Sequence, residues 1–148
     1  MEDRKNMKLE DRVALAMAYH DRGFNCAQAV ACAYCDKAGI DEKTMFQLTE
    51  GFGLGMGMME MCGALSGMMM VIGLANSVGD LEKGMPTKGS TYKQVKEQVQ
   101  KFKEKNGSYL CRELKGVETG KVLCSCPQCI MDAVALTEEY LKKHQADK

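Results

Sequence analysis

The longest apolar run of the chain reads MCGALSGMMMVIGLA and occupies residues 61–75. It is shorter than the roughly 20 apolar residues that cross a bilayer, and the polar residues Glu60 and Asn76 bound it. We therefore expect a buried helix at the centre of the fold and no membrane partner. Gly63 and Gly67 lie one helical turn apart, so a second helix can pack closely against that face.

Helical patterns continue on both sides of this central run. Apolar residues recur at helical spacing, and capping residues or glycines stand where the patterns begin and end. No segment alternates as a strand does, and no internal repeat or domain boundary is visible. The sequence therefore predicts an all-α, single-domain bundle of five or six helices over residues 1–148, with its core at about residues 9–143. The expected helices cover about residues 9–21, 26–38, 41–50, 60–77, 91–106 and 126–143.

A glycine-rich connection precedes the central helix. Residues 51–57 read GFGLGMG, with a glycine at every second position. The dinucleotide-binding fingerprint and the Walker sequence need other glycine spacings, and the Walker sequence also needs a lysine. We therefore expect no nucleotide site. The glycines instead allow a tight turn and a close approach of the backbone to another segment.

Charge and cysteine content narrow the range of functions. Twenty Lys and Arg residues balance twenty Asp and Glu residues, so no net field attracts nucleic acid. The first residues, MEDRKNMKLEDR, contain no apolar export signal, and we expect a cytoplasmic location. In that reducing compartment the eight cysteines suit metal or redox chemistry better than structural disulfides.

Two of the cysteines stand at predicted helix starts. Asn25 and Gln28 form a capping-box pattern around Cys26, and Ser125 precedes Cys126 in the same way. Unpaired N–H groups and the positive end of the helix dipole stabilise a thiolate at such positions. We therefore expect Cys26 and Cys126 to ionise more readily than ordinary cysteines.

Cys32 and Cys35 fall into a different class. They are three residues apart on a predicted helix, so they neighbour each other on one face, and both point away from Cys26. A buried cysteine often behaves as a small apolar residue. We expect Cys32 and Cys35 to be core residues that share no site with Cys26.

Residues 126–129 read CPQC, the C-x-x-C spacing of thiol–disulfide oxidoreductases, at a predicted helix start. The βαβ pattern of thioredoxin-like folds is absent around it. One hypothesis is therefore a dithiol–disulfide oxidoreductase without a cofactor, with Cys126 as the attacking thiolate. The resolving cysteine is then Cys129, Cys124 or Cys26. The partner of this reaction is a small thiol or a redox partner protein.

Five motifs follow one another along the chain. They are NCAQAV at 25–30, GFGLGMG at 51–57, CGALSG at 62–67, CREL at 111–114 and CPQCIMDA at 126–133. In this order and spacing they resemble the C_GCAxxG_C_C family, whose members are described as redox-active. The resemblance covers about residues 23–141. It implies a helical domain with four signature cysteines, Cys26, Cys62, Cys111 and Cys126. The chain departs from the family pattern around Cys62, where it reads Met-Cys-Gly instead of Gly-Cys-Ala.

The four signature cysteines support another hypothesis, a metal or iron–sulfur site for electron transfer. Their separations of 36, 49 and 15 residues are not the paired C-x-x-C knuckles of structural zinc modules, so an iron–sulfur cluster is favoured over zinc. Both hypotheses describe a redox-active protein and are compatible with an oxidoreductase. A third hypothesis is a non-catalytic, thiol-rich helical protein. The sequence leaves open whether Cys124 and Cys129 join the four, and whether the chain forms a homo-oligomer.

Overall fold

The computed structural model describes residue 4 and residues 6–146. Eight α-helices lie in this part of the chain, six of them at least seven residues long, and it contains no β-strand. The predicted all-α class is thereby confirmed, and the six longer helices correspond to the five or six that were predicted. In chain order the helices are α1 (Leu9–Asp21), α2 (Cys26–Cys32), α3 (Cys35–Ala38), α4 (Glu42–Thr49), α5 (Gly63–Asn76), α6 (Lys88–Asn106), α7 (Cys111–Lys115) and α8 (Cys126–Ala146).

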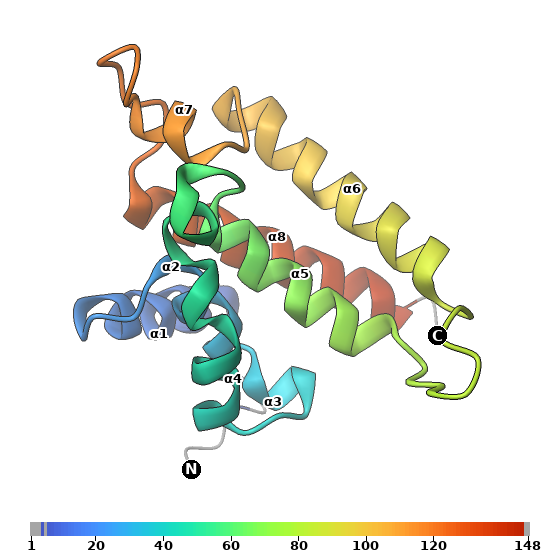
Figure 1. Cartoon of the computed structure of the whole chain (residues 1–148). Helices are drawn as coiled ribbons and strands as arrows, with labels where there is room; N and C mark the ends of the chain where they lie inside the picture. The colour runs from blue at the N-terminus through green and yellow to red at the C-terminus, as the bar shows by residue number, and fades with distance from the viewer. Residues whose placement is uncertain (1–3, 5, 147–148) are drawn as a thin grey trace.

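Helix α5 lies at the centre of the fold, alongside α8 and with α6 on one flank (Figure 1). Its side chains Leu65, Met68 and Val71 are fully buried. Burying each such side chain contributes about 1.5–3 kcal/mol to stability. The predicted buried central helix is therefore confirmed. Among the described residues, no helix is both long and apolar enough to pass through a lipid bilayer.

Helix α2 packs directly against α5 because two glycines leave space at the contact. A Cβ atom added to Gly67 would lie 2.6 Å from the carbonyl oxygen of Ala27, and one added to Gly63 would lie 3.4 Å from the Ala27 nitrogen. The close approach of a second helix to this face, predicted from the glycine spacing, is confirmed. This contact sets the first residue of α2 beside the start of α5.

Side-chain caps fix where two of the helices begin. At α2, the Asn25 and Gln28 side chains each accept a hydrogen bond from the other residue's backbone N–H, both at 2.9 Å. At α4, the backbone N–H of Thr44 donates to the Asp41 carboxylate at 2.9 Å. Each bond satisfies a backbone donor that the first helical turn leaves unpaired. The predicted starts of these helices are confirmed.

The helix predicted over residues 26–38 is wrong in one respect, because the structure breaks it after Cys32. Two arginine side chains donate hydrogen bonds to the carbonyl groups at the break. The Arg4 guanidinium donates to the Cys32 carbonyl at 2.9 Å, and that of Arg12 donates to the Ala33 carbonyl at 2.7 Å. These carbonyls therefore need no amide from the next helical turn. Both contacts are distant in sequence, and apolar periodicity carries no information about them.

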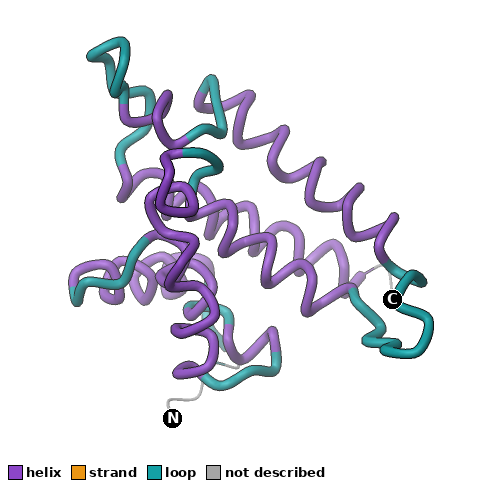
Figure 2. Tube along the Cα trace, viewed as in Figure 1, coloured by secondary structure: helices purple, strands orange, loops and turns teal. Residues whose placement is uncertain are grey.

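A loop of residues 77–87 joins α5 to α6 (Figure 2), and α6 begins at Lys88 rather than near the predicted residue 91. The Asn76 amide donates to the Thr91 hydroxyl at 2.8 Å. The Gln94 amide in turn donates to the Asn76 side-chain oxygen at 3.1 Å. These polar side chains thus hold the beginning of α6 against the end of α5.

Candidate functional site

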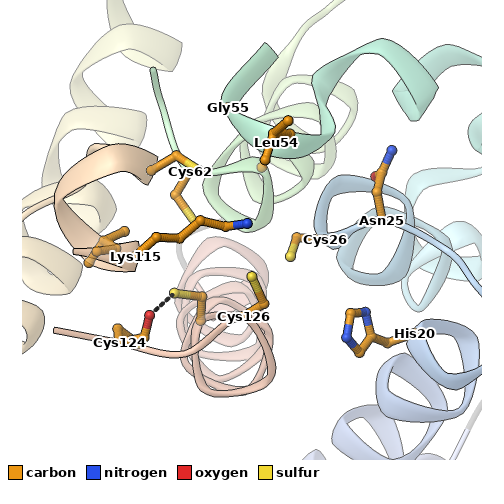
Figure 3. A pocket seen from close by; sticks show the side chains of 13 residues that line it. His20, Asn25, Cys26, Leu54, Gly55, Cys62, Lys115, Cys124 and Cys126 are labelled. Carbon is orange, nitrogen blue, oxygen red and sulfur yellow. Dashed lines mark hydrogen bonds between the residues drawn. The ribbon is translucent and has the colours of Figure 1, made fainter. Parts of the chain in front are cut away.

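A cavity of about 200 Å³ lies where the starts of α2, α5, α7 and α8 meet. The cysteines that line it are Cys26, Cys62, Cys111, Cys124, Cys126 and Cys129 (Figure 3). The structure therefore brings all four signature cysteines to one cavity and adds Cys124 and Cys129. Cys32 and Cys35 do not line it, as their position on the predicted helix indicated.

Each signature cysteine stands at the start of a helix. Cys26 begins α2, and Cys111 begins α7. Cys126 begins α8, and Cys62 directly precedes α5. Backbone N–H groups in a first helical turn have no partner within their own helix. The cavity therefore collects sulfur atoms and backbone donors in the same place.

A short backbone pairing brings Cys62 and Cys111 together across 49 residues of sequence. The N–H of Cys62 donates to the Tyr109 carbonyl at 2.9 Å, and the N–H of Cys111 donates to the Glu60 carbonyl at 2.6 Å. These bonds flank an isolated antiparallel bridge rather than a strand pair. A bridge this short leaves no alternating pattern in the sequence, so the sequence could not predict it.

The glycine-rich connection forms one wall of the cavity. Leu54 and Gly55 line it, both with left-handed backbone at φ 54° and φ 57°. A Cβ atom on Gly55 would lie 2.9 Å from the Cβ of Cys111 and 2.5 Å from the nitrogen of Glu60. The close backbone approach predicted for residues 51–57 is confirmed, and it is made to a cavity cysteine.

The segment before α8 folds back onto α7 and carries Cys124 to the cavity. The N–H groups of Leu123 and Cys124 donate to the Leu114 carbonyl at 2.9 and 3.2 Å. One turn into α8, the Cys129 sulfur lies 3.8 Å from the Cys124 carbonyl oxygen, the contact dashed in Figure 3. These backbone contacts explain why the cavity contains two sulfurs beyond the four signature cysteines.

Cys62 has a lowered pKa, at about 7. The largest cause is the hydrogen bond that the Cys129 thiol donates to the Cys62 sulfur. Backbone N–H groups of Ala64 and Leu65, in the first turn of α5, and the positive charge of Lys115 act in the same direction. Together they outweigh the effect of burial, which favours the neutral thiol. The surroundings of Cys62 therefore favour its thiolate form.

Burial dominates at other thiols of the cavity. It is the largest cause of the raised pKa of Cys26, and the neighbouring Cys126 adds to it. Burial is also the largest cause of the raised pKa values of Cys111 and Cys124. The expected thiolate at Cys26 is therefore wrong. Its helix start faces an enclosed space shared with other thiols, where loss of hydration outweighs the helix dipole.

The cavity is also lined by two basic side chains that were not among the predicted site residues. The Lys115 ammonium extends into the space between Cys62 and Cys26 (Figure 3). The His20 ring lies at the edge beside Cys26, with Nδ1 3.3 Å from the Phe24 carbonyl oxygen. Lys115 directly follows the CREL motif, and this is the one sequence signal that could have identified it. His20 reaches the cavity only because α1 and α2 are folded together.

The cavity thiols lie against one another. Cys62 pairs with Cys129, which also interacts with Cys124, and Cys26 pairs with Cys126. Across the part of the chain that the structure describes, no three Cys, His, Asp or Glu side chains are gathered so as to hold an ion as they stand. Ligation of a metal at this cavity therefore requires sulfur atoms to turn out of these pairs.

Comparison with known proteins adds one match. Residues 24–140 match a family described as "putative redox-active protein (C_GCAxxG_C_C)". No curated protein and no solved structure matches the chain. The matched range reaches from the residue before the α2 cap into the last turns of α8 and contains all six cavity cysteines.

Proposed function

Because the chain belongs to the C_GCAxxG_C_C family of redox-active proteins, we propose that its cysteine-lined cavity holds an iron–sulfur cluster, or another metal, for electron transfer. The proposed ligands are Cys26, Cys62, Cys111 and Cys126. One observation carries the proposal. Four cysteines far apart in sequence, each at the start of a different helix, line the same cavity.

The residues at the cavity suit such a group. Four cysteine thiolates are the ligand set of common iron–sulfur clusters and of many tetrahedral zinc sites. The volume of about 200 Å³ is many times the roughly 10–15 Å³ that a cavity needs, on the same measure, to hold one water molecule. A space of this size favours a group of several atoms over a single zinc ion. Buried Leu114 adds an apolar wall that limits the access of water.

When bound, an iron–sulfur cluster supplies a centre that accepts and gives single electrons. The chain's own residues hold that centre and set its electrostatic surroundings. The first-turn backbone N–H groups of Ala64 and Leu65 and the positive charge of Lys115 favour negative charge on the Cys62 sulfur. Hydrogen bonds and positive charge favour the more negative, reduced state, so these residues raise the reduction potential.

Metal binding at these thiols releases protons, because the ligand is the thiolate. When a metal binds, the paired thiols must separate: Cys26 moves away from Cys126, and Cys62 moves away from Cys129. Cys26 has a raised pKa, so its deprotonation opposes metal binding most strongly at low pH. We therefore expect metal affinity to increase with pH across the neutral range.

Anaerobic reconstitution with iron and sulfide, followed by gel filtration and metal analysis, tests the proposal. The native chain should retain iron and show visible absorbance, and both should be lost in the variants Cys26→Ser, Cys62→Ser, Cys111→Ser and Cys126→Ser. Cys35→Ser is the matched control, since its thiol is buried but lies outside the cavity. A colourless native protein with intact thiols and no bound metal contradicts the proposal.

Thiol–disulfide exchange is a second candidate function, favoured by the hydrogen-bonded pair of Cys62 and Cys129. The Cys62 thiolate attacks one sulfur of a substrate disulfide, whose S–S bond breaks, and the departing thiolate takes up a proton. Cys129 then loses its proton and attacks the Cys62 sulfur, which expels the second substrate thiol. The substrate gains two electrons and two protons, and a Cys62–Cys129 disulfide remains.

This exchange differs from the one predicted from the sequence, in which Cys126 attacks. In the structure Cys126 contacts Cys26, whereas Cys129 contacts Cys62. Single-turnover reduction of a small disulfide by the metal-free protein separates the two versions. Cys62→Ser should abolish the reaction and Cys126→Ser should leave it intact. The opposite result supports Cys126 as the nucleophile, and full activity in both variants contradicts either version.

A further inference from the structure

Cys32 and Cys35 form another cysteine pair, outside the cavity. Cys32 ends α2 and Cys35 begins α3, with exposures of 0% and 1%. Between them the chain turns, with Ala33 at φ −64° and ψ −16° and Tyr34 at φ −119° and ψ 18°. These angles are near those of a type I turn, whose first and last Cα atoms lie within about 7 Å. Disulfide-bonded cysteines have Cα separations of about 4.4–6.8 Å.

We propose that Cys32 and Cys35 are a second redox couple, which an oxidant of the size of hydrogen peroxide converts from dithiol to disulfide. The turn geometry, with a buried cysteine at each end of the turn, carries this inference. The couple is independent of what the cavity holds. Neither thiol lines the cavity, and neither is one of the four signature cysteines.

The two thiols differ in acidity. The Cys32 sulfur lies 3.9 Å from the Glu42 carbonyl oxygen, and its interaction with Cys35 lowers the pKa of Cys35 and raises the pKa of Cys32. Burial opposes ionisation of Cys35, the charge of Arg4 favours it, and the carboxylates of Glu42 and Asp36 oppose it. The pair therefore has a distinct nucleophile, Cys35, and a resolving thiol, Cys32.

Contacts from other helices hold the turn in place. The Arg12 guanidinium, from α1, donates to the Ala33 carbonyl at 2.7 Å. The Tyr34 hydroxyl donates to the Val134 carbonyl, on α8, at 3.0 Å. A backbone fixed at both central residues of the turn keeps the two sulfurs close. Disulfide formation then needs rotation of side chains rather than rearrangement of the fold.

Burial excludes bulky oxidants from the pair, and a small oxidant such as a peroxide must reach it through local opening of the fold. The Cys35 thiolate attacks one oxygen of hydrogen peroxide, the O–O bond breaks, and the departing hydroxide takes up a proton to become water. Cys32 then loses its proton and attacks the sulfur of the Cys35 sulfenic acid, whose S–O bond breaks to release a second water. The two thiols lose two electrons, which reduce one peroxide to two waters.

Peptide mapping of the full chain after mild treatment with hydrogen peroxide tests the couple. Free thiols are blocked in denaturant, and trypsin with chymotrypsin then cuts after Arg22, Tyr34 and Lys37. The fragments on either side of Tyr34 should stay joined until a reductant is added, with Cys26 carrying the block. Separate fragments with every thiol blocked, or a link through Cys26, overturn the proposal.

Two serine variants assign the roles of the pair. In Cys32→Ser, Cys35 lacks its resolving thiol and should accumulate a sulfenic acid that dimedone traps. In Cys35→Ser, Cys32 should remain a free thiol under the same treatment. Dimedone trapping at Cys32 but not at Cys35 contradicts the assigned nucleophile. The mapping of the native chain decides whether the couple exists even where a variant fails to fold.

Discussion

At the residue scale, Cys62 is the thiol that the cavity prepares for chemistry. Its neighbour Cys129 donates to it, and the start of α5 faces it. The stabilisation of a thiolate by the first turn of a helix, which led us to expect ionisation at Cys26, operates instead at Cys62. The difference is that Cys62 also receives a hydrogen bond from a second thiol, whereas the burial of Cys26 outweighs its helix start.

Removing the Cys129 donor should raise the pKa of Cys62. We expect Cys129→Ala to move it upward from about 7, because the thiolate loses the hydrogen bond that stabilises it most. Cys129→Ser is the matched control, since a hydroxyl can still donate. The measurement is the rate of alkylation of Cys62 in metal-free protein as a function of pH. Equal midpoints for Cys129→Ala and the native chain would contradict this origin of the shift.

At the scale of elements, Gly55 positions Cys111 through the close approach of two backbones. Gly55→Ala should weaken folding and increase alkylation of Cys111, because its Cβ would lie 2.9 Å from that of Cys111. Gly57→Ala is the matched control, since Gly57 also has positive φ but has no neighbour within 4 Å. It should show only the backbone strain of about 1–2 kcal/mol. Identical alkylation rates in the two variants would exclude the proposed contact.

The contact of α2 with α5 depends on Gly67 in the same manner. We expect Gly67→Ala to destabilise the fold by about 1–3 kcal/mol through overpacking, because its Cβ would lie 2.6 Å from the Ala27 carbonyl oxygen. Gly73→Ala, on the same helix with open space, should be neutral or stabilise by up to about 1 kcal/mol. Urea unfolding measures both. A stabilised Gly67→Ala protein would show that the close approach is not required.

Local signals predicted the elements well and their contacts poorly. The Asn25 and Asp41 caps act through neighbours close in sequence, and the α5 glycines are visible by their one-turn spacing; the structure confirms what was predicted from each. The break after Cys32 depends on Arg4 and on Arg12, which come from distant segments. No periodic pattern encodes such contacts, which is why the sequence predicted one continuous helix there.

At the site, too, local sequence motifs were predictive and long-range contacts were not. The family resemblance named four cysteines, and all four line one cavity. Cys124 and Cys129 were left open, and Lys115 and His20 were not predicted. Cys124 reaches the cavity through the fold-back of the 116–125 segment and His20 through the packing of α1, and neither arrangement has a sequence signature.

At the scale of the whole molecule, buried thiols and a buried tyrosine limit stability at high pH. Cys32, Cys129 and Tyr34 are at most 3% exposed, and each has a raised pKa. Stability from a raised pKa is complete below the pKa of the unfolded chain and is lost as pH rises toward the folded value. We expect stability to fall above about pH 9, where unfolded thiols ionise. Each such group contributes up to about 1.4 kcal/mol per pH unit.

Urea unfolding of reduced, metal-free protein between pH 8 and pH 10 measures this loss. Cys62 and Cys35 contribute in the opposite direction, because each has a lowered pKa. Their stabilisation is complete above the pKa of the unfolded thiol and is lost as pH falls through the folded value. The buried groups with raised pKa values outnumber these two thiols, so the net slope should be negative above about pH 9. A flat or rising profile would show that these groups are solvated.

X-ray absorption at the iron edge, on protein reconstituted anaerobically and desalted, tests the proposed centre most directly. A cluster held by Cys26, Cys62, Cys111 and Cys126 predicts iron surrounded by sulfur alone, with a second shell of iron at short range. The Cys35→Ser protein should give the same spectrum. Iron that is lost on desalting, or that is surrounded by oxygen and nitrogen without neighbouring iron, would contradict an iron–sulfur centre in this cavity.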